Sequence, residues 1–354
     1  MRVIFAGGGT GGHLFPGLAV AREFQRRDRM TEILFMGTTQ GIEHRVLPKE
    51  GYRLETLPVR GLKGRGLRGA LDALYGVPAS LLRSLKIMRD FRPDCVIGLG
   101  GYASGPALLA AKLAGVRAAI MEQNLRPGFT NKLLSRWVDR VFTGYPGSAA
   151  FFPGARVVES GNPVRWQKLP DVEKRAEFSV LIFGGSLGAR RINFAVVDAL
   201  KQLIDLKAEI FIMHQTGELD FAAVRAAYDA LPFSAEVTRF IDKMDEAYAR
   251  ADLIVCRAGA TTTAELIAAG KASIMVPFPF AADDHQRKNA EALEAAGAAR
   301  MILQEQLSGD RLVTEIQKLV QSPEELNRME EASRKLAHGD AAAAAVDMIE
   351  ELIT

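Results

Sequence analysis

The chain has 354 residues, of which 48% are hydrophobic and 25% charged, and its formal net charge is +3. This length predicts about two domains, and the composition is that of an ordinary globular protein. A charge this small does not indicate nucleic-acid binding. No apolar run reaches the roughly 18 residues that a membrane-spanning helix needs. We expect no signal peptide, because no basic region precedes an apolar segment at the N-terminus. Cys95 and Cys256 lie in apolar runs, which favours buried free thiols in a reducing compartment.

Short β-rich runs alternate with helical patterns along the whole chain. In the first half, the predicted strands cover residues 2–6, 32–37, 54–59, 95–99, 118–122 and 140–143, with helical segments such as 17–28 and 105–114 between them. After Pro163, a second series of strands is predicted at 179–183, 209–214, 235–240, 253–257, 273–277 and 299–303. Near-continuous apolar strands of this kind indicate parallel sheets that are covered on both faces.

The two series of strands predict an α/β chain with two Rossmann-like, doubly wound parallel-sheet domains. We expect the first domain at residues 1–162, a linker at 163–177 and the second domain at 178–338. Ser322 followed by Pro323 is typical of a helix start, with an N-cap and a proline at the first helical position. Residues 339–354 are expected to form a last amphipathic helix.

The first strand runs directly into a glycine-rich loop, because residues 3–13 read VIFAGGGTGGH. A strand, a turn without side chains and a helix N-terminus together form an anion site, since backbone N–H groups and the helix dipole favour negative charge there. Gly7, Gly9 and Gly12 match the dinucleotide pattern GxGxxG. The second strand, however, ends in residues 37–39 (Gly-Thr-Thr), without the acid that grips a ribose. The loop therefore suits a phosphorylated ligand other than NAD.

His13 stands at the end of this loop, where a titratable group would face whatever the loop holds. A histidine there can serve as a general base that removes a proton from an attacking alcohol. The alternative is a polar residue that only satisfies a helix end.

Two further loops follow apolar strands of the second domain. Residues 257–265 read RAGATTTAE and open a helix, so their hydroxyl and N–H groups are placed to hold a phosphate. Glu265 would accept from ribose hydroxyls, or alternatively is a first-turn acid favoured by the helix dipole alone. In the loop 277–286, Gln286 would read sugar hydroxyls together with Asn289, and a surface polar role for His285 is equally open.

No cluster of carboxylates with metal-ligand spacing is present in the sequence. Asp283 and Asp284 form the only adjacent acid pair in a site loop, and they equally suit a solvated turn. We therefore expect no metal and no cofactor, with the charge of a phosphorylated ligand met by helix N-termini.

Together these loops resemble the MurG family. The motifs that carry the resemblance run through the whole chain in order: GGGTGGH, GGYASGP (100–106), EQN (122–124), GNPVR (161–165), GGSLGA (184–189), RAGATTTAE and AADDHQ (281–286). The resemblance implies the GT-B glycosyltransferase fold, in which two Rossmann-like domains face a cleft and the last helix packs back on the first domain. It implies an inverting transfer of N-acetylglucosamine from UDP-N-acetylglucosamine (UDP-GlcNAc) to the C4 hydroxyl of undecaprenyl-diphosphate-linked muramyl-pentapeptide, the step from lipid I to lipid II in peptidoglycan synthesis.

The resemblance also implies the site residues, with His13 as the catalytic base. In the first domain, the UDP-GlcNAc site would comprise Thr10, Gly11 and Gly12 near the diphosphate, and Asn124 and Arg165 near the sugar and phosphates. In the second domain, Ser186 would hold phosphate, the backbone of Ile241 would contact uracil, and Gln286 would bind the GlcNAc hydroxyls. Phosphate and ribose would be held by Ala260, Thr261, Thr262, Thr263 and Glu265, with Glu265 on the ribose. Two positions depart from the family pattern, because Met121 and Phe280 stand where members often have histidine. Neither residue can transfer protons, which places more weight on His13.

Residues 62–92 carry seven basic side chains against only Asp72 and Asp90, interleaved with leucines at helical spacing. One interpretation is an ordinary pair of helices, in which the apolar stripe of residues 81–88 faces the core. Residues 62–77 instead predict a basic, glycine-rich loop and short apolar stripe that binds anionic lipid, with Lys132, Arg136 and Trp137 adding to the patch. A peripheral enzyme on the cytoplasmic face of the cell membrane is therefore expected, with no nucleic acid as partner and cell-wall assembly proteins as candidate partners.

Two other functions remain open at this level. A UDP-GlcNAc 2-epimerase of the same architecture needs no lipid, so the basic apolar segment argues against it. A non-catalytic nucleotide-binding module would explain the glycine loops but leaves His13 and Gln286 without a role.

Overall fold

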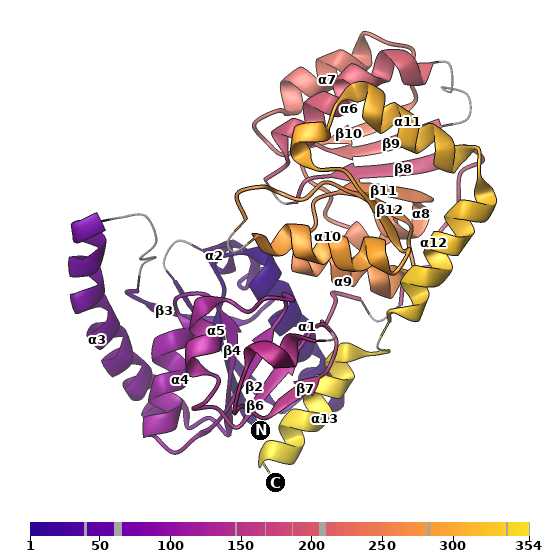
Figure 1. Cartoon of the computed structure of the whole chain (residues 1–354). Helices are drawn as coiled ribbons and strands as arrows, with labels where there is room; N and C mark the ends of the chain where they lie inside the picture. Colours follow the sequence, from indigo (N-terminus) through magenta and orange to yellow (C-terminus); the bar gives the residue numbers. More distant parts are fainter. Residues whose placement is uncertain are drawn as a thin grey trace. The chain divides into compact units, whose positions relative to one another are not determined.

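A computed structural model describes residues 1–38, 41–59, 66–145, 147–166, 168–185, 187–204, 210–281, 284–337 and 339–353, except for the side chains of residues 66–75. The chain divides into two compact units, each an α/β unit built on a parallel sheet (Figure 1). Unit 1 comprises Met1–Arg165 and His338–Thr354, and unit 2 comprises Trp166–Ala337. Within the described ranges, we find no helix with the length and apolar character required to cross a bilayer.

Unit 1 contains a seven-stranded parallel sheet in the order β3-β2-β1-β4-β5-β6-β7. Its strands are β1 (Arg2–Gly7), β2 (Glu32–Thr38), β3 (Arg53–Leu57), β4 (Cys95–Gly100), β5 (Arg117–Glu122), β6 (Arg140–Thr143) and β7 (Val157–Glu159). The strand order reverses between β1 and β4, and ligands of open α/β sheets bind outside the carboxyl ends of the strands at such a switch point. The glycine loop that follows β1 lies there.

Helices cover both faces of this sheet. They are α1 (Gly11–Arg27), α2 (Glu43–Val46), α3 (Gly66–Phe91), α4 (Ser104–Leu113), α5 (Phe129–Leu134) and α13 (Ala341–Ile353), with the 3-10 helix η1 (Ser148–Phe151). Successive residues of β1 enter different cores: Val3 and Phe5 pack with α1 and α13, whereas Ile4 and Ala6 pack with α4. This alternation explains why the strand is apolar at every position.

The C-terminal helix α13 belongs to unit 1 and packs against α1 (Figure 1). Val346 and Ile349 are fully buried in the core that α1 and the sheet share. At the rim, the Arg27 guanidinium is 2.5 Å from an Asp347 carboxylate oxygen and 3.2 Å from one of Glu350. The apolar stripe therefore faces unit 1, and its charged flank makes ion pairs with the end of α1.

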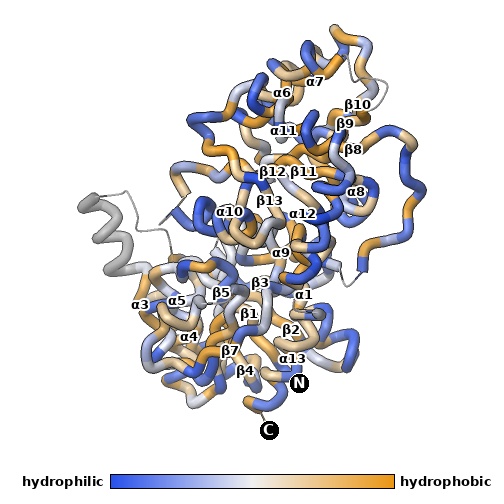
Figure 2. Tube along the Cα trace, turned by 45° about the vertical axis from the view of Figure 1, so that its right-hand side comes forward, coloured by the Kyte–Doolittle hydropathy of each residue, from blue (hydrophilic) through white to orange (hydrophobic). Residues whose placement is uncertain are grey.

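Unit 2 contains a six-stranded parallel sheet in the order β10-β9-β8-β11-β12-β13. Its strands are β8 (Phe178–Phe183), β9 (Ile210–Gln215), β10 (Ala235–Thr238), β11 (Leu253–Cys256), β12 (Ser273–Met275) and β13 (Ala299–Met301). Its helices are α6 (Arg190–Leu203), α7 (Phe221–Asp229), α8 (Met244–Arg250), α9 (Ala260–Ala269), α10 (His285–Ala295), α11 (Gly309–Val320) and α12 (Pro323–Lys335), with the 3-10 helix η4 (Gln304–Gln306). Hydrophobic segments gather along strands such as β8 and β11 (Figure 2).

The predicted fold class is confirmed, because both units are doubly covered parallel sheets. Three local expectations change. The short edge strand β7 was not predicted. Residues 81–88 belong to one 26-residue helix, α3, instead of a pair, but their expected apolar core stripe is confirmed, because Ile87 and Met88 are buried in a core that includes residues of α4. Helix α3 starts at Gly66, so much of the predicted loop at 62–77 is helical, while residues 60–65 lie outside the described ranges. Ser322 does precede α12, but its side chain makes no cap hydrogen bond.

Candidate active site

The first glycine loop connects β1 to α1 at the switch point of unit 1. Gly7, Gly8 and Gly9 all have positive φ values, of 138°, 131° and 86°, and such backbone is open mainly to glycine. A Cβ on Gly7 would also collide with the carbonyl oxygen of Gly100. The loop therefore lies against the carboxyl end of β4, to which the Gly8 N–H donates a 3.3 Å hydrogen bond at Gly100.

The N–H groups of this loop have different partners. That of Gly9 donates to a carboxylate oxygen of Glu43 at 2.9 Å, and that of His13 donates to the Thr10 carbonyl at 3.3 Å. Gly11 and Gly12 open α1, and the first N–H groups of a helix have no partner within the helix. These two N–H groups, at the positive end of the helix dipole, suit an anion.

His13 lies where three loops of unit 1 converge. Its Nδ1 is 3.1 Å from the Thr10 hydroxyl oxygen, which holds the ring at the mouth of the loop. A Cβ on Gly100 would lie 3.0 Å from the His13 ring and 3.4 Å from the Asn131 side-chain nitrogen. The loops after β1, β4 and β5 thus meet around Gly100, and the half-buried His13 imidazole lies at their junction.

The loop after β5 is organised by a buried carboxylate. Glu122 is 2% exposed and accepts hydrogen bonds from the N–H groups of Asn124 and Gly128, both at 3.0 Å, and from the Asn131 amide at 2.9 Å. The Asn124 side chain also donates to Glu122, at 3.2 Å. Asn124, predicted to lie near the donor sugar, therefore donates its hydrogen bonds to Glu122, two residues before it in the same loop. Met121 is buried in the core between the sheet and α1.

Arg165 is the last residue of the first segment of unit 1. Its guanidinium carbon lies 4.7 Å from the centre of the Phe15 ring in α1, within the range of a cation–π contact. Its carbonyl oxygen accepts a 3.4 Å hydrogen bond from Arg22. The structure thus places Arg165 against the N-terminal half of α1, the helix that the glycine loop opens.

The second glycine turn connects β8 to α6 in unit 2. Gly185 and Gly188 have φ values of 94° and 77°, while Ser186, the predicted phosphate residue, lies outside the described residues. The buried Gln215 side chain ties this turn to the loop after β10, because its amide nitrogen donates to the Gly185 carbonyl at 2.8 Å and its oxygen accepts from the Ile241 N–H at 3.0 Å. The Ile241 N–H, one of the two backbone groups expected to meet uracil, is thus bonded within the unit.

The N-terminus of α9 follows β11 at the centre of the unit 2 sheet. Gly259 is the N-cap, and the Thr263 hydroxyl turns back to the Ala260 carbonyl at 2.9 Å. The side-chain oxygen of Thr261 is buried and has no hydrogen-bond partner among the described residues. An unsatisfied buried hydroxyl at a helix N-terminus indicates a place for a polar ligand. Ala260, Thr261 and Thr262 therefore line the end of the helix that suits a phosphate.

Glu265 lies deeper in the same helix. Because α9 begins at Ala260, Glu265 is beyond the first turn, where the dipole effect has faded. The alternative that the dipole alone explains this acid is therefore wrong. Its carboxylate is 2% exposed and accepts a 3.2 Å hydrogen bond from the hydroxyl of Tyr248, whose ring lies 5.1 Å from that of Trp166. A buried carboxylate of this kind is an effective acceptor for ligand hydroxyls.

Arg257 fixes the loop after β12. Its guanidinium donates to the carbonyl oxygens of Val276 and Pro277 at 3.0 and 3.2 Å, and burial lowers its pKa to about 10. In the same loop, the Gln286 side-chain oxygen accepts from the Phe278 N–H at 3.0 Å. The Asn289 amide donates to the Ala258 carbonyl at 3.1 Å, which links α10 to the loop after β11.

Phe280, which stands where family members often have histidine, belongs to the same loop. Phe280 is 81% exposed and contacts the Phe278 ring edge-to-face at 5.6 Å. Residues 282–283, which include Asp283 of the adjacent pair of acids, lie outside the described ranges. Over the ranges that are described, no three His, Cys, Asp or Glu side chains are grouped so as to hold a metal ion.

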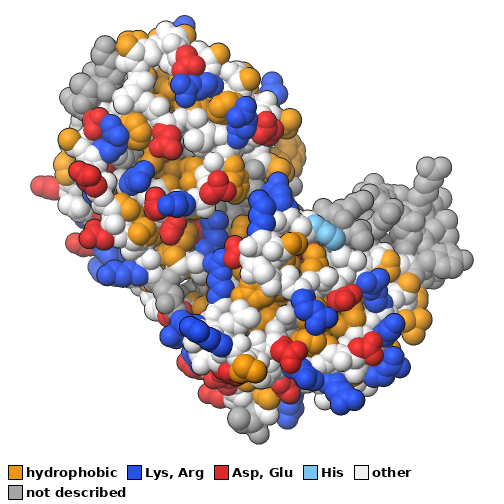
Figure 3. Space-filling model, turned by 180° about the vertical axis from the view of Figure 1, so that it is seen from behind, with side chains coloured by type: hydrophobic (Ala, Val, Ile, Leu, Met, Phe, Trp, Pro, Cys, Tyr) orange, Lys and Arg blue, Asp and Glu red, His pale blue; other side chains and the backbone are white. Residues whose placement is uncertain are grey.

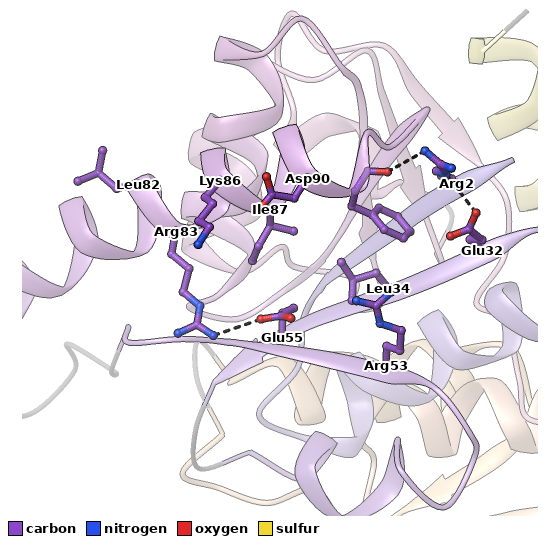
Figure 4. A pocket seen from close by; sticks show the side chains of 11 residues that line it. Arg2, Glu32, Leu34, Arg53, Glu55, Leu82, Arg83, Lys86, Ile87 and Asp90 are labelled. Carbon is purple, nitrogen blue, oxygen red and sulfur yellow. Dashed lines mark hydrogen bonds and ion pairs between the residues drawn. The ribbon is translucent and has the colours of Figure 1, made fainter.

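A cavity of about 830 Å³ in unit 1 is lined by residues of β1, β2, β3 and α3 (Figure 4). These are the first residues of the three strands, at their amino ends, and the C-terminal part of α3. Arg2 pairs with Glu32 and Arg83 with Glu55, both at 3.2 Å. This cavity is therefore separate from the carboxyl edge, where the predicted site residues of unit 1 lie.

Sequence reasoning missed Glu43, Gln215 and Arg257 as residues that hold these loops. Each is a polar side chain with at least one backbone partner that is 19 or more residues away in the sequence, so no local pattern marks it. The loops themselves, with helix N-termini at the carboxyl edges of two parallel sheets, are typical of enzymes that bind phosphorylated nucleotides.

The class of protein follows from comparison with known families. Residues 3–143 match the glycosyltransferase family 28 N-terminal domain and residues 179–349 match its C-terminal domain. The chain is therefore a glycosyltransferase of family 28, which accounts for its two sheets and its glycine turns.

Relatives define the family more closely. The chain is 50% identical over its whole length to a Myxococcus xanthus protein, 93% of which is covered, named UDP-N-acetylglucosamine–N-acetylmuramyl-(pentapeptide) pyrophosphoryl-undecaprenol N-acetylglucosamine transferase. It is 34% identical to the crystal structure of Acinetobacter baumannii MurG, with a TM-score of 0.79 over 99% of both chains. The chain belongs to the MurG family. A Neisseria meningitidis UDP-GlcNAc 2-epimerase has a TM-score of 0.70, with 99% of this chain and all of that one covered, but at 14% identity it shares the fold alone.

Proposed function

We propose that this chain transfers N-acetylglucosamine from UDP-GlcNAc to the C4 hydroxyl of undecaprenyl-diphosphate-linked muramyl-pentapeptide, with inversion at the anomeric carbon. The observation that carries this proposal is the 50% identity, over the entire chain, to a protein named for that transfer. The arrangement of His13 and of the glycine turns supports it, because a base and several anion-binding loops are what the reaction requires.

In unit 1, His13 acts as the general base. The acceptor's C4 hydroxyl oxygen attacks the anomeric carbon of the donor sugar, and the imidazole takes the hydroxyl proton as the new bond forms. The bond between the anomeric carbon and the diphosphate oxygen breaks, and UDP leaves with that electron pair. Support comes from the 3.1 Å contact between Thr10 and His13, which fixes the ring beside the N–H groups of Gly11 and Gly12.

In unit 2, UDP-GlcNAc binds along the carboxyl edge of the sheet. We assign phosphate contacts to the start of α9 at Ala260, Thr261, Thr262 and Thr263, and to Ser186, the ribose to Glu265, and uracil to the backbone of Ile241. Gln286 reads the GlcNAc hydroxyls. The buried Thr261 hydroxyl and the buried Glu265 carboxylate support these assignments. From unit 1, Thr10, Gly11 and Gly12 meet the diphosphate, and Asn124 and Arg165 complete the proposed donor contacts.

The acceptor is anchored in lipid, and we propose that the chain meets an anionic membrane surface, on the cytoplasmic face, through unit 1. Phe129, Leu133 and Trp137 are spaced four residues apart and are 78%, 55% and 48% exposed. Lys132 and Arg136 between them are exposed as well. An exposed apolar stripe with basic flanks is typical of helices that lie in a membrane interface. On the face seen in Figure 3, Lys and Arg are interspersed with Asp and Glu.

Co-sedimentation with vesicles tests the membrane part. Binding should be stronger to vesicles with anionic lipid than to neutral ones, should weaken with salt, and should fall when Phe129 and Leu133 are changed to Ser. A matched control changes the exposed Leu113, in α4, to Ser. Equal binding to neutral and anionic vesicles, unaffected by salt, would rule out the electrostatic contribution.

UDP release with and without a lipid-linked acceptor analogue, in detergent, tests the transfer itself. The transferase releases UDP only when the acceptor is present. A 2-epimerase would instead convert UDP-GlcNAc without any acceptor, and a non-catalytic module would turn over neither substrate. Acceptor-independent epimerisation of the donor, with no transfer, would refute the proposed function.

A further inference from the structure

Glu43 is a fully buried carboxylate beside the first glycine loop. One oxygen accepts the Gly9 N–H at 2.9 Å, and the other accepts the N–H and the hydroxyl of Thr38 at 2.9 and 3.1 Å. Among the residues that the structure describes, no Lys or Arg forms an ion pair with it. Burying a charge without a counter-ion is costly unless hydrogen bonds satisfy it, so these three donors are what make this position tolerable.

The surrounding glycines provide the space for this carboxylate. A Cβ on Gly41 would overlap a Glu43 oxygen, and a Cβ on Gly37 or Gly8 would lie 2.7 or 3.0 Å from the side chain. Gly37 and Gly41 do not have positive φ values. Their lack of a side chain is therefore required by the carboxylate rather than by the backbone conformation. Three glycines from two segments thus enclose one acid.

The place of this acid in the fold is informative. It lies just after β2, where a dinucleotide-binding unit carries the acid that grips a ribose. The sequence gives no acid within residues 37–39, and the structure supplies one from α2 instead. Here the carboxylate turns inward and takes up the Gly9 N–H, so that N–H is not free for a phosphate. With the Gly8 N–H bonded to Gly100 as well, the N–H groups left for an anion lie at the helical end of the loop, from Thr10 to Gly12.

We propose that Glu43 is a positioning residue for the transfer reaction. It holds Gly9 in place, and Gly9 precedes Thr10, whose hydroxyl contacts His13 Nδ1. Glu43 thereby fixes both the imidazole and the free N–H groups of α1 relative to the sheet, without touching substrate. This proposal rests on the proposed function, because it assigns Glu43 an effect on turnover through His13.

The variant Glu43→Gln tests it, because an amide nitrogen cannot accept from one of the two N–H groups that now face the carboxylate. We expect kcat to fall about tenfold or more, because small misplacements of a catalytic group are costly. The Kd for UDP should rise by a smaller factor, because the uracil, the ribose and part of the phosphate contacts are assigned to unit 2. Hydrogen exchange in a fragment covering residues 8–13 should accelerate, while fragments of β1 and β4 stay protected. If Glu43 had only a structural role, the variant would also lose protection in the strands, and the effects on kcat and on the loop would not occur alone.

Glu23→Gln is the matched control. Glu23 is also a buried carboxylate of unit 1, 2% exposed, but it pairs with Arg26 and Arg27 at the far end of α1. Its kcat should stay within about threefold of the wild-type value. If Glu43→Gln loses protection throughout unit 1, the variant Gly41→Ala is used for the test instead. Its added methyl group displaces the Glu43 side chain, which stays a carboxylate.

Wild-type kcat in Glu43→Gln, or in Gly41→Ala where that variant decides, overturns the positioning role while leaving the proposed function intact. Failure of the wild-type chain to transfer GlcNAc to the acceptor refutes the proposed function instead. In that case the faster exchange of residues 8–13 in Glu43→Gln still reports the anchoring of the loop.

Discussion

Replacing Glu265 by Gln tests the proposed ribose contact in unit 2. Its carboxylate is 2% exposed, so water does not screen it, and Tyr248 occupies one of its acceptor sites. A hydrogen bond to a charged group contributes about 1.5–3 kcal/mol, which corresponds to roughly a 10–150-fold change in Kd. Because a Gln oxygen still accepts, we expect the lower end of this range, about a tenfold weaker affinity for UDP.

Titration calorimetry with two ligands isolates the contact. The wild-type chain should bind 2′,3′-dideoxyuridine diphosphate about tenfold more weakly than UDP, whereas Glu265→Gln should discriminate between them about threefold at most. Glu315→Gln is the control, because Glu315 is 4% exposed in α11 and pairs with Arg300 and Arg311, so its loss should lower stability and leave UDP affinity unchanged. Equal discrimination by the wild-type chain and Glu265→Gln would refute the ribose assignment.

Three further predictions concern the base, the C-terminal helix and a buried histidine. His13→Ala should lower kcat by roughly 10²–10⁴-fold, as expected for loss of a general base, without changing the UDP affinity measured by calorimetry. Ile349→Ala should lower the free energy of unfolding of unit 1 by about 2–5 kcal/mol in urea titrations, because Ile349 is fully buried between α13 and the sheet. Burial lowers the pKa of His214 to about 3, from an ordinary value of 6.5. The unfolded chain therefore binds a proton that the folded unit does not, and the thermal midpoint of unit 2 should fall as the pH drops from 6.5 toward 3.

Each of these has its own contrary outcome. A kcat reduced less than tenfold would remove His13 from proton transfer. Leu113→Ala, at a 63% exposed position, is the control for Ile349→Ala. If the two variants have the same free energy of unfolding, α13 lies outside the core of unit 1. For the third prediction, His214→Gln should flatten the acid side of the stability profile, and an unchanged slope would assign the proton uptake to other groups.

The central strands were predictable because they are buried on both faces. Residues 180–183 are apolar without interruption and end at glycine, and β8 begins and ends within one residue of the predicted range. β7 escaped prediction because it is a three-residue edge strand with no fully buried residue. The last helix was visible from the spacing of Val346, Ile349 and Leu352.

The loops were predictable, whereas the residues that hold them were not. A glycine cluster after an apolar strand is a local signal, so the turns at 7–12 and 184–188 stand out in the sequence. Glu43 and Gln215 act through tertiary hydrogen bonds to Gly9 and Ile241, which no local pattern encodes. Gly37 and Gly41 do point to Glu43, because their φ values are not positive and their lack of a side chain is explained by the carboxylate beside them. This can be recognised only with coordinates.

Analysis of the lipid product after incubation with UDP-GlcNAc and the lipid-linked muramyl-pentapeptide tests the central claim most directly. Mass spectrometry should show the acceptor heavier by one N-acetylhexosamine, and NMR of the product should show a β linkage formed from the α-configured donor. An acceptor of unchanged mass, with the UDP-sugar converted to its 2-epimer or left intact, would contradict the account.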